Sequence, residues 1–195
     1  MRQNPARRAA LLDAAIEVLA REGARGLTFR AVDVEAQVPN GTASNYFDNR
    51  DDMLTQIGYR FYERVEPDPG VLAAGLEGPR DRAKVTQLMH DLVDRISRFR
   101  SGYLALLELR LEATRRPELR RLLTERIRAD VDANIRYHTE SGLPGDATTV
   151  VLLYLALNWL IVERLTLPDV FPEDRIHDLV TDVVDRILPG PDHSG

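Results

Sequence analysis

Apolar residues recur at helical spacing along most of the chain, and this spacing constrains the fold more than any other feature of the sequence. Between residues 85 and 99 they occupy positions i, i+3, i+4 and i+7 of successive turns: Val85, Leu88, Met89, Leu92, Val93, Ile96 and Phe99. That pattern is typical of an amphipathic helix. Strand-like alternation never lasts long enough to compete, and no long internal repeat is present. We therefore predict an all-α protein.

Composition places the chain among ordinary globular proteins. Of its 195 residues, 44% are hydrophobic and 29% charged, which allows a sizeable core and is unlike disordered or collagen-like proteins. The lack of cysteine excludes disulfides, thiolate metal sites and cysteine nucleophiles. Charged residues interrupt the first apolar segment at Asp13, Glu17 and Arg21, unlike the core of an export signal, so we expect a cytoplasmic protein.

The net charge of −5 is unevenly distributed along the chain. Residues 143–195 carry three basic side chains against nine acidic ones, whereas the first thirty residues carry six arginines against three acids. This balance argues against a protein that coats nucleic acid through charge alone. A site for nucleic acid would have to be local.

Capping residues predict where the first helices begin. Asn4 before Pro5 starts a helix, because Asn caps free N–H groups and Pro at the first position loses no needed donor. Thr28 and Asn49 are further N-cap candidates. The predicted helices of the first third are 5–21, 29–37, a short segment ending at Phe47, and 49–66.

Four more helices and a nearly all-apolar segment follow by the same criteria. Gly102 is expected to end one helix and Gly142 another, because glycine commonly terminates helices. The predicted helices span about 81–101, most of the stretch between Pro117 and Gly142, 147–167, and 176–188, and the apolar segment spans 103–111.

The helix over 147–167 is apolar around most of its circumference. Its most apolar stretch, 150–162, is interrupted by Asn158 and is shorter than the ~20 residues that cross a bilayer, so no membrane contact is expected. A helix that is apolar all round must be covered on more than one side. A second copy of the last two helices would supply that cover, so we predict a homodimer with a four-helix interface.

The first third of the chain has the order of a helix-turn-helix reader of DNA. A long helix precedes two short helices separated by a tight turn, and a fourth helix braces them. The second short helix must present groups that reach base edges and phosphates. Residues Asn40, Gly41, Thr42, Ala43, Ser44, Asn45 and Tyr46 supply amide, hydroxyl and methyl groups of that kind, the Ala43 methyl being suited to touch a thymine methyl.

These residues resemble the DNA-binding domain of TetR-type transcriptional regulators. The resemblance rests on Gly26-Leu27-Thr28, then on the run from Val38 to Phe47 (Val-Pro-Asn-Gly-Thr-Ala-Ser-Asn-Tyr-Phe), and on Asn49-Arg50-Asp51-Asp52-Met53-Leu54. The family pattern is Gly-x-x-Thr, then Gly-x-x-Tyr-x-x-Phe in the recognition helix, then Lys-x-x-Leu. The match covers about the first quarter of the chain and has several parts, which makes it specific.

Three positions depart from the family pattern. Ser44 replaces the central tyrosine of the recognition helix, so the expected tyrosine–phosphate contact moves to Tyr46. Gln37 stands where the turn commonly has glycine, and Pro39 where a serine is usual. Arg50 takes the place of the phosphate-binding lysine. The resemblance thus implies DNA-binding residues Thr28, Asn40, Gly41, Thr42, Ala43, Ser44, Asn45, Tyr46 and Arg50.

The resemblance also implies an organisation and a function. It predicts a three-helix helix-turn-helix domain over 1–48, a connecting fourth helix over 49–66, and a larger helical domain over 67–195 that binds an effector and dimerises through its last two helices. The expected function is a ligand-responsive regulator, most readily a repressor, that binds a palindromic operator on double-stranded DNA. Effector binding is expected to move the connecting helix and so change the spacing of the two recognition helices.

An effector pocket in a helical domain is expected between helices, with mostly apolar walls. Asn158 is the polar candidate, and it serves either ligand recognition or dimer register. The candidate lining residues for a largely apolar small molecule are Phe61, Tyr62, Met89, Val93, Phe99, Tyr103, Leu107, Tyr137, Leu155, Asn158 and Trp159.

Catalysis has little support in the sequence. The four histidines lack the spacing of a zinc-binding helix, and neither a nucleophile elbow nor a phosphate-binding loop is present. We expect no enzyme activity and no required metal or cofactor. The remaining alternative is a helical small-molecule-binding or interaction protein without DNA binding, which the near-neutral charge of residues 1–66 favours.

Overall fold

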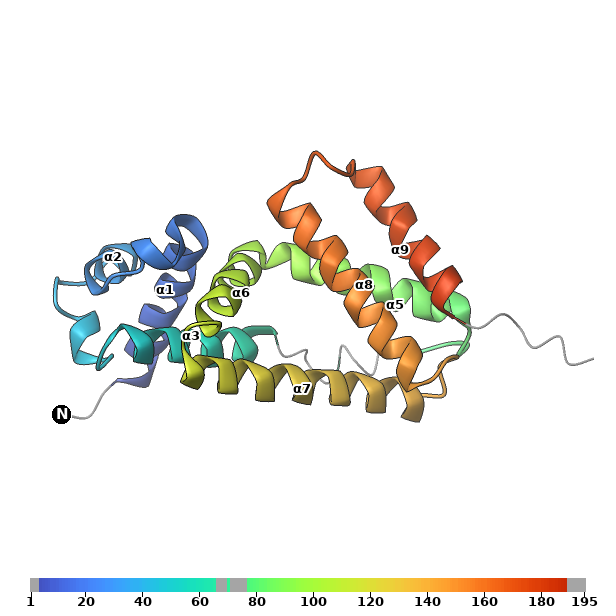
Figure 1. The fold of residues 1–195 in the computed structure, drawn as a ribbon, viewed down its shortest axis with the longest axis horizontal. Coiled ribbons are helices and arrows are strands. Elements are labelled where there is room, and N and C mark those ends of the chain that lie inside the picture. The colour runs from blue at the N-terminus through green and yellow to red at the C-terminus, as the bar shows by residue number, and fades with distance from the viewer. Residues whose placement is uncertain (1–3, 66–69, 71–76, 189–195) are drawn as a thin grey trace, which may run out of the picture. The chain divides into compact units, whose positions relative to one another are not determined.

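The structure is a computed structural model that describes residues 4–65, 70 and 77–188. These residues form helices and connecting turns, and no strand lies in this part of the chain (Figure 1). The helices are α1 (Pro5–Gly26), α2 (Phe29–Glu35), the 3₁₀ helix η1 (Ala43–Asn45), α3 (Arg50–Val65), α5 (Arg82–Arg98), α6 (Arg100–Ala113), α7 (Pro117–Glu140), α8 (Ala147–Thr166) and α9 (Glu173–Ile187). The predicted all-α class is confirmed.

The chain divides into two compact units. Unit 1 comprises Met1–Glu66 and Phe99–Ile127, and unit 2 comprises Pro67–Arg98 and Arg128–Gly195. One boundary of these units falls after residue 66, where the sequence predicts the division, but residues 99–127, expected in the second domain, pack with the N-terminal helices. Residue 66 itself, where the connecting helix was expected to end, lies outside the described residues.

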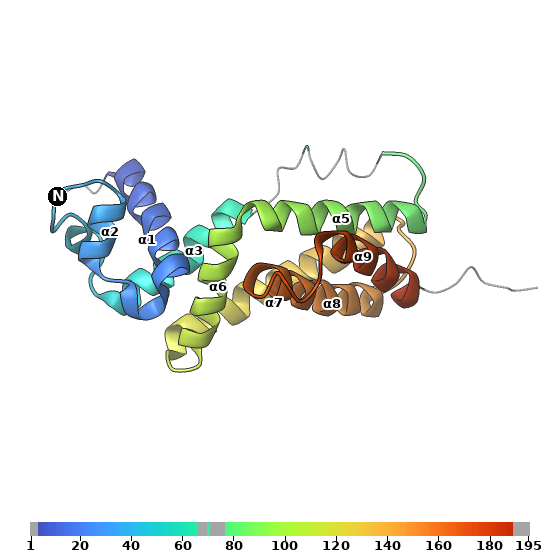
Figure 2. The same ribbon diagram turned by 90° about the horizontal axis from the view of Figure 1, so that it is seen from above.

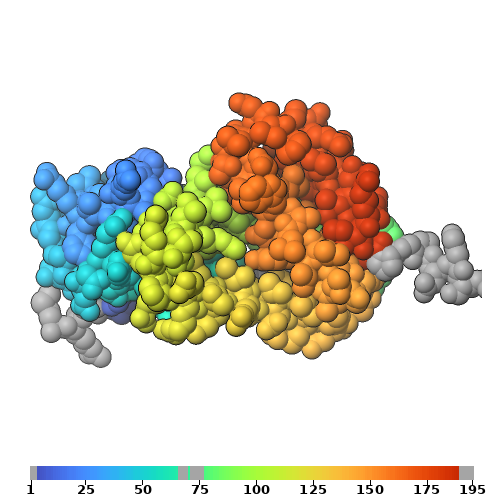
Figure 3. Space-filling view, in the orientation of Figure 1, coloured from blue at the N-terminus to red at the C-terminus, as the bar shows by residue number. Residues whose placement is uncertain are grey.

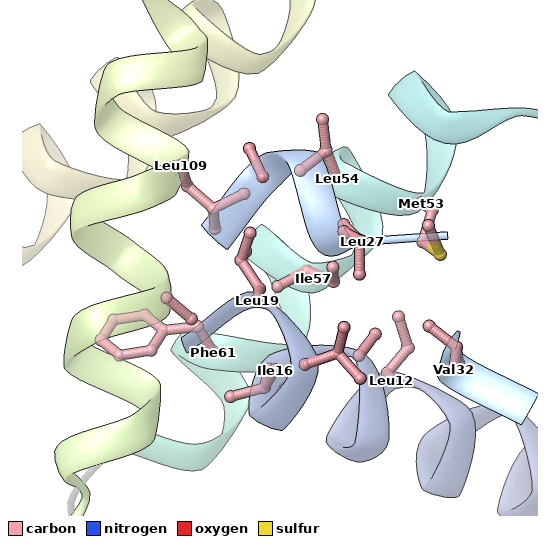
Figure 4. Packing of buried hydrophobic residues seen from close by; sticks show 14 of the residues in the cluster. Leu12, Ile16, Leu19, Leu27, Val32, Met53, Leu54, Ile57, Phe61 and Leu109 are labelled. Carbon is pink, nitrogen blue, oxygen red and sulfur yellow. The ribbon is translucent and has the colours of Figure 1, made fainter. Parts of the chain in front are cut away.

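The core of unit 1 is formed by α1, α2, α3 and α6. Leu12, Ile16 and Leu19 of α1 belong to one buried cluster with Val32 of α2, Ile57 of α3 and Leu109 of α6 (Figure 4). Most of these side chains are fully buried, so each contributes roughly 1.5–3 kcal/mol of transfer free energy. The predicted helix-turn-helix therefore packs on a core that also contains α6, about 50 residues later in the sequence.

Unit 2 contains α5, α8 and α9, which pack against one another (Figure 2). Their shared core includes the buried residues Val85 of α5, Leu153 of α8 and Val184 of α9. The turn before α8 is held by His138, whose buried ring Nε2 lies 2.8 Å from the carbonyl oxygen of Pro144. Among the described helices, α8 alone is long and apolar enough to span a membrane, a property that it shares with core helices.

The predicted caps are confirmed. Asn4 accepts hydrogen bonds from the backbone of Ala6 and Arg7, Thr28 from Ala31, and Asn49 from Asp52, at 2.9–3.3 Å. Each cap lies within three residues of its partner, which is why local sequence predicts it.

The prediction that Gly102 ends a helix is wrong. The break falls at Phe99, and Gly102 lies buried inside α6. A Cβ at position 102 would collide with the ring of Phe99, so the glycine provides space for an aromatic side chain. The second short helix of the predicted helix-turn-helix, expected to end at Phe47, is the three-residue 3₁₀ helix η1, which ends at Asn45.

Candidate nucleic-acid interface

The turn between α2 and η1 is built around Gln37. Its φ of 54° lies in the left-handed region, where glycine is favoured, and it is the one described non-glycine residue with positive φ. The departure from glycine seen in the sequence therefore falls where the backbone needs glycine most. The turn is formed nevertheless, and the backbone N–H of Val38 donates to the carbonyl of Asp33 at 3.0 Å.

Asp33 fixes the segment that follows the turn. Its side chain is buried, and its two carboxylate oxygens accept hydrogen bonds from the backbone N–H groups of Gly41 and Ala43, both at 2.7 Å. These bonds satisfy donors at the start of η1 that have no helical partner. Asp33 was not among the predicted site residues, because its hydrogen-bond partners lie eight and ten residues later and no local sequence pattern predicts them.

The polar side chains of the predicted recognition segment surround this anchored turn. Asn40, Gly41, Ser44 and Asn45 are exposed, and Thr42 is half-buried. The Ser44 hydroxyl and the Asn45 amide donate to the Gly41 carbonyl at 2.8 and 2.9 Å. The Ser44 oxygen, which acts as donor in this bond, keeps acceptor capacity for an incoming group.

Ala43 does not belong to this surface. Its side chain is fully buried in the core of unit 1, so the predicted contact of its methyl with a thymine methyl cannot be made. Tyr46 is half-buried and packs on the same core. Phe47 is buried and lies near Phe29, with ring centroids 6.5 Å apart. Ala43, Tyr46 and Phe47 thus pack η1 against the core of unit 1.

Arg50 and Thr28 flank the segment. Thr28 is exposed at the N-terminus of α2, where its hydroxyl caps the helix. Arg50, the first residue of α3, is half-buried and donates from its guanidinium to the carbonyl oxygen of Ala24. The guanidinium therefore already donates one hydrogen bond within unit 1, and a phosphate contact would have to use its remaining N–H groups.

The charge of the two units differs in sign. Unit 1 carries 16 basic against 14 acidic side chains, a net charge of +2, whereas unit 2 carries 10 against 17, a net charge of −7. Residues 99–127 supply seven of the arginines of unit 1. The unit that holds the reader is therefore the basic one, which residues 1–66 alone do not reveal.

The predicted effector residues are distributed between the two units. In unit 1, Phe61 packs against three other rings: Phe99 and Tyr103 at centroid distances of 6.0 and 5.9 Å, and Tyr62 at 5.2 Å. The Arg64 guanidinium lies 4.0 Å from the Phe99 centroid, a cation–π contact. We refer to Phe61, Tyr62, Phe99 and Tyr103 as the aromatic cluster. Leu107, also in unit 1, is half-buried on α6.

The other six candidates lie in unit 2. Val93 is buried, and Met89 packs against the buried cluster that contains Val85, Leu153 and Val184. Burial raises the pKa of the Tyr137 hydroxyl. Asn158 is half-buried and donates to the Tyr154 carbonyl of its own helix at 2.8 Å. Its predicted hydrogen bond is confirmed, although neither of its two predicted roles is decided by that bond.

Leu155 and Trp159 occupy a different environment from the remaining candidates. Their side chains are 58% and 66% exposed, and Leu152, on the same face of α8, is 46% exposed. Figure 3 shows the surface of α8, in orange, on the face drawn. Large apolar side chains in this arrangement are typical of a protein interface rather than of a cavity.

The comparisons with known proteins agree with this geometry. Residues 11–57 match the family described as "Bacterial regulatory proteins, tetR family", and residues 80–190, more than half of the chain, match "Tetracyclin repressor-like, C-terminal domain". No curated protein matches the chain.

Solved structures extend the likeness over the whole chain. The multidrug binding protein EbrR, complexed with imidazole, has 27% identity and a TM-score of 0.67, with 98% of this chain and 100% of that chain covered. EbrR complexed with ethidium has 28% identity and a TM-score of 0.67, with 95% and 100% covered. A member of the TetR family from Streptomyces coelicolor A3 has 26% identity and a TM-score of 0.69, also with 95% and 100% covered. The chain therefore belongs to the TetR family of transcriptional regulators.

Proposed function

We propose that the protein is a homodimeric repressor that binds a palindromic operator and is released by a small-molecule effector. The observation that carries this proposal is the anchored turn. The buried carboxylate of Asp33 holds the start of η1, and the polar groups of Asn40, Ser44 and Asn45 stand exposed around it. This turn lies in the basic unit of the protein.

The reader would use two kinds of contact. Asn40, Ser44 and Asn45 offer amide and hydroxyl groups to base edges, whereas Thr28, Tyr46 and Arg50 offer donors to phosphates. The Gly41 N–H and the Thr42 hydroxyl already donate to Asp33 and Pro39. Because phosphates position and bases specify, loss of an amide should change sequence preference. Loss of Arg50 should weaken all sequences alike and reduce the salt dependence.

The dimer would form through α8 and α9. Leu152, Leu155 and Trp159 present an exposed apolar face on α8 that a second copy would cover. A two-fold dimer requires two-fold symmetric half-sites, one helical turn or a multiple of it apart. The operator would therefore be a palindrome, and cytoplasmic location would give access to it.

The effector would be a largely apolar, flat aromatic molecule. EbrR, which is 27–30% identical, is described in complexes with imidazole, ethidium and proflavin. In this chain the aromatic cluster joins the end of α3 to the start of α6. Since α3 begins at the reader, a ligand that moves its far end would shift Arg50 and the recognition segment. Such coupling requires that the ligand prefers the conformation that does not bind DNA.

Selection from random duplex DNA tests the DNA-binding part of the proposal. The purified wild-type protein should enrich a palindrome. A variant carrying Asn40→Ala and Asn45→Ala should enrich a different or less defined sequence. Thr124→Ala, at an exposed position of α7 in unit 1, serves as the matched control and should select the wild-type palindrome.

The alternative function is a ligand-binding protein without DNA binding. If wild-type protein enriches no sequence even at low salt, the repressor proposal fails and this alternative takes its place. Ethidium fluorescence then separates the two activities: a saturable rise on titration with protein, reduced by Tyr103→Ala, would establish ligand binding without DNA binding.

A further inference from the structure

Helix α1 is interrupted three residues before its end. Gly23 has φ 68° and ψ −179°, a conformation that glycine adopts readily and other residues do not. After this break, both backbone polar groups of the next residue, Ala24, are held by side chains from other helices. The Ala24 N–H donates to Oε2 of Glu108 on α6 at 3.0 Å, and the Ala24 carbonyl accepts from Arg50 on α3.

We propose that Glu108 is a positioning residue for the DNA reader. This inference rests on the proposed function. Ala24 lies four residues before Thr28, which caps α2, and it also holds Arg50, the first residue of α3. A carboxylate that fixes Ala24 therefore fixes the position of both the first reader helix and the expected phosphate-binding arginine. Glu108 reaches this point from 84 residues away in sequence.

A second carboxylate of α6 leads to the other end of the reader. Glu112, one turn after Glu108, is buried and pairs with Arg116. The Nε of Arg116 in turn donates to Oδ1 of Asp51 in the first turn of α3 at 2.8 Å. On one face of α6, Glu108 thus bonds to the end of α1, and Glu112 is connected through Arg116 to the start of α3. The helix holds the reader at both of its junctions.

The geometry of Glu108 favours a specific role over general packing. A hydrogen bond from a backbone N–H to a charged acceptor is stronger than one to a neutral acceptor, and its loss leaves the Ala24 donor without this acceptor. Helix α6 also contacts α1 at Ser101, whose hydroxyl donates to Oε1 of Glu17 at 2.7 Å. That bond joins the same two helices but lies away from the reader, which makes Ser101 a matched control.

The experiment measures operator affinity for four variants and wild type, on the duplex that wild type selects. Glu108→Ala removes the acceptor, and Glu108→Asp withdraws it by one methylene while keeping the charge. Both should weaken binding about tenfold or more, the change that corresponds to the lost bond. Glu108→Gln keeps an acceptor oxygen and should stay within about threefold of wild type, as should Ser101→Ala. Urea unfolding of each variant establishes that it is folded.

Wild-type affinity for both Glu108→Ala and Glu108→Asp would overturn the inference. An equal loss in Ser101→Ala would overturn it too, because the effect would then belong to general α1–α6 packing. If Glu108→Ala does not fold, Glu108→Asp carries the same test.

Amide hydrogen exchange at Ala24 gives a reading that needs no operator. Exchange should be at least about tenfold faster in Glu108→Asp than in wild type, and unchanged exchange would overturn the positioning role. If wild type selects no DNA at all, the proposed function fails, while this reading still decides whether Glu108 holds the end of α1.

Discussion

Gln37 occupies a backbone conformation that disfavours its side chain. At φ 54° a residue with a Cβ incurs a steric cost of about 1–2 kcal/mol, which glycine avoids. The greater conformational entropy of glycine in the unfolded chain offsets part of this gain. We therefore expect Gln37→Gly to raise the free energy of unfolding by only about 0.5–1 kcal/mol. Urea denaturation measures this change. Gln87→Gly, an exposed position inside α5, should lower it by a similar amount, and destabilisation by both variants would contradict the account.

Asp33 is the residue on which the recognition segment most depends. Asp33→Ala leaves the N–H groups of Gly41 and Ala43 without acceptors, so we expect a loss of about 3 kcal/mol in the free energy of unfolding. Asp33→Asn, which keeps one acceptor oxygen, should lose less. Asp48→Asn, exposed in the same segment, should change stability by under about 0.5 kcal/mol. Equal stability of Asp33→Ala and Asp48→Asn would show that the two bonds do not hold the turn.

Residues that act locally could be predicted from sequence, and those with distant partners could not. The caps Asn4, Thr28 and Asn49 were predicted because each bonds within three residues. Asp33 was missed because its partners come after a turn, and Glu108 because its partner is 84 residues away. Helical spacing in a three-residue segment could not decide which side of it is buried.

At the scale of the elements, periodicity and caps predicted α1, α3, α5, α7, α8 and α9, but glycine proved ambiguous as a stop signal. Gly142 has positive φ and lies just beyond the end of α7, as a terminating glycine should. Gly102 instead accommodates the Phe99 ring inside α6. The difference depends on a packing neighbour, so the sequence pattern alone does not contain it.

The packing of α5 against α9 should depend on pH. His90 and His177 stack across these helices with ring centroids 3.9 Å apart, and His90 Nε2 lies 3.1 Å from Thr181 Oγ1. Burial, and then the charge of His177, lower the pKa of His90 below its ordinary value of 6.5, against the opposite effects of Asp94 and Asp91. The folded state therefore binds fewer protons than the unfolded state, and stability is lost as the pH falls through 6.5.

Unfolding at pH about 7.5 and about 5.5 measures this effect. Wild type should lose more stability between the two pH values than His90→Gln, which has no ring to protonate. The same loss in both proteins would assign the pH dependence to other groups.

At the scale of the whole molecule, the exposed face of α8 predicts the oligomeric state. Trp159→Glu replaces the most exposed of the apolar residues Leu152, Leu155 and Trp159 by a charge, so it should convert a dimer to a monomer. Ala133→Glu, exposed on α7 in unit 2, should leave the dimer intact. Sedimentation measures both masses. A monomeric wild type would contradict the proposed dimer, and a dimeric Trp159→Glu variant would place the dimer contact on another surface.

The units show what sequence order conceals at this scale. The predicted division at residue 66 follows the chain, whereas packing joins residues 99–127 to the reader and changes its net charge from −1 for residues 1–66 to +2 for unit 1. The resemblance in the first quarter pointed to the family. Only the structure shows that α6 belongs with the reader.

Sequence-specific reading by a two-fold dimer is the central claim, and one binding measurement tests it most directly. The affinity of wild type for the selected duplex is compared, at one salt concentration, with its affinity for the same duplex with one half-site scrambled. Since each mismatched base pair costs roughly 1–3 kcal/mol, the intact palindrome should bind at least about a hundredfold more tightly. Equal affinity for the two duplexes would contradict the account, because it would leave only the attraction between a basic unit and phosphate.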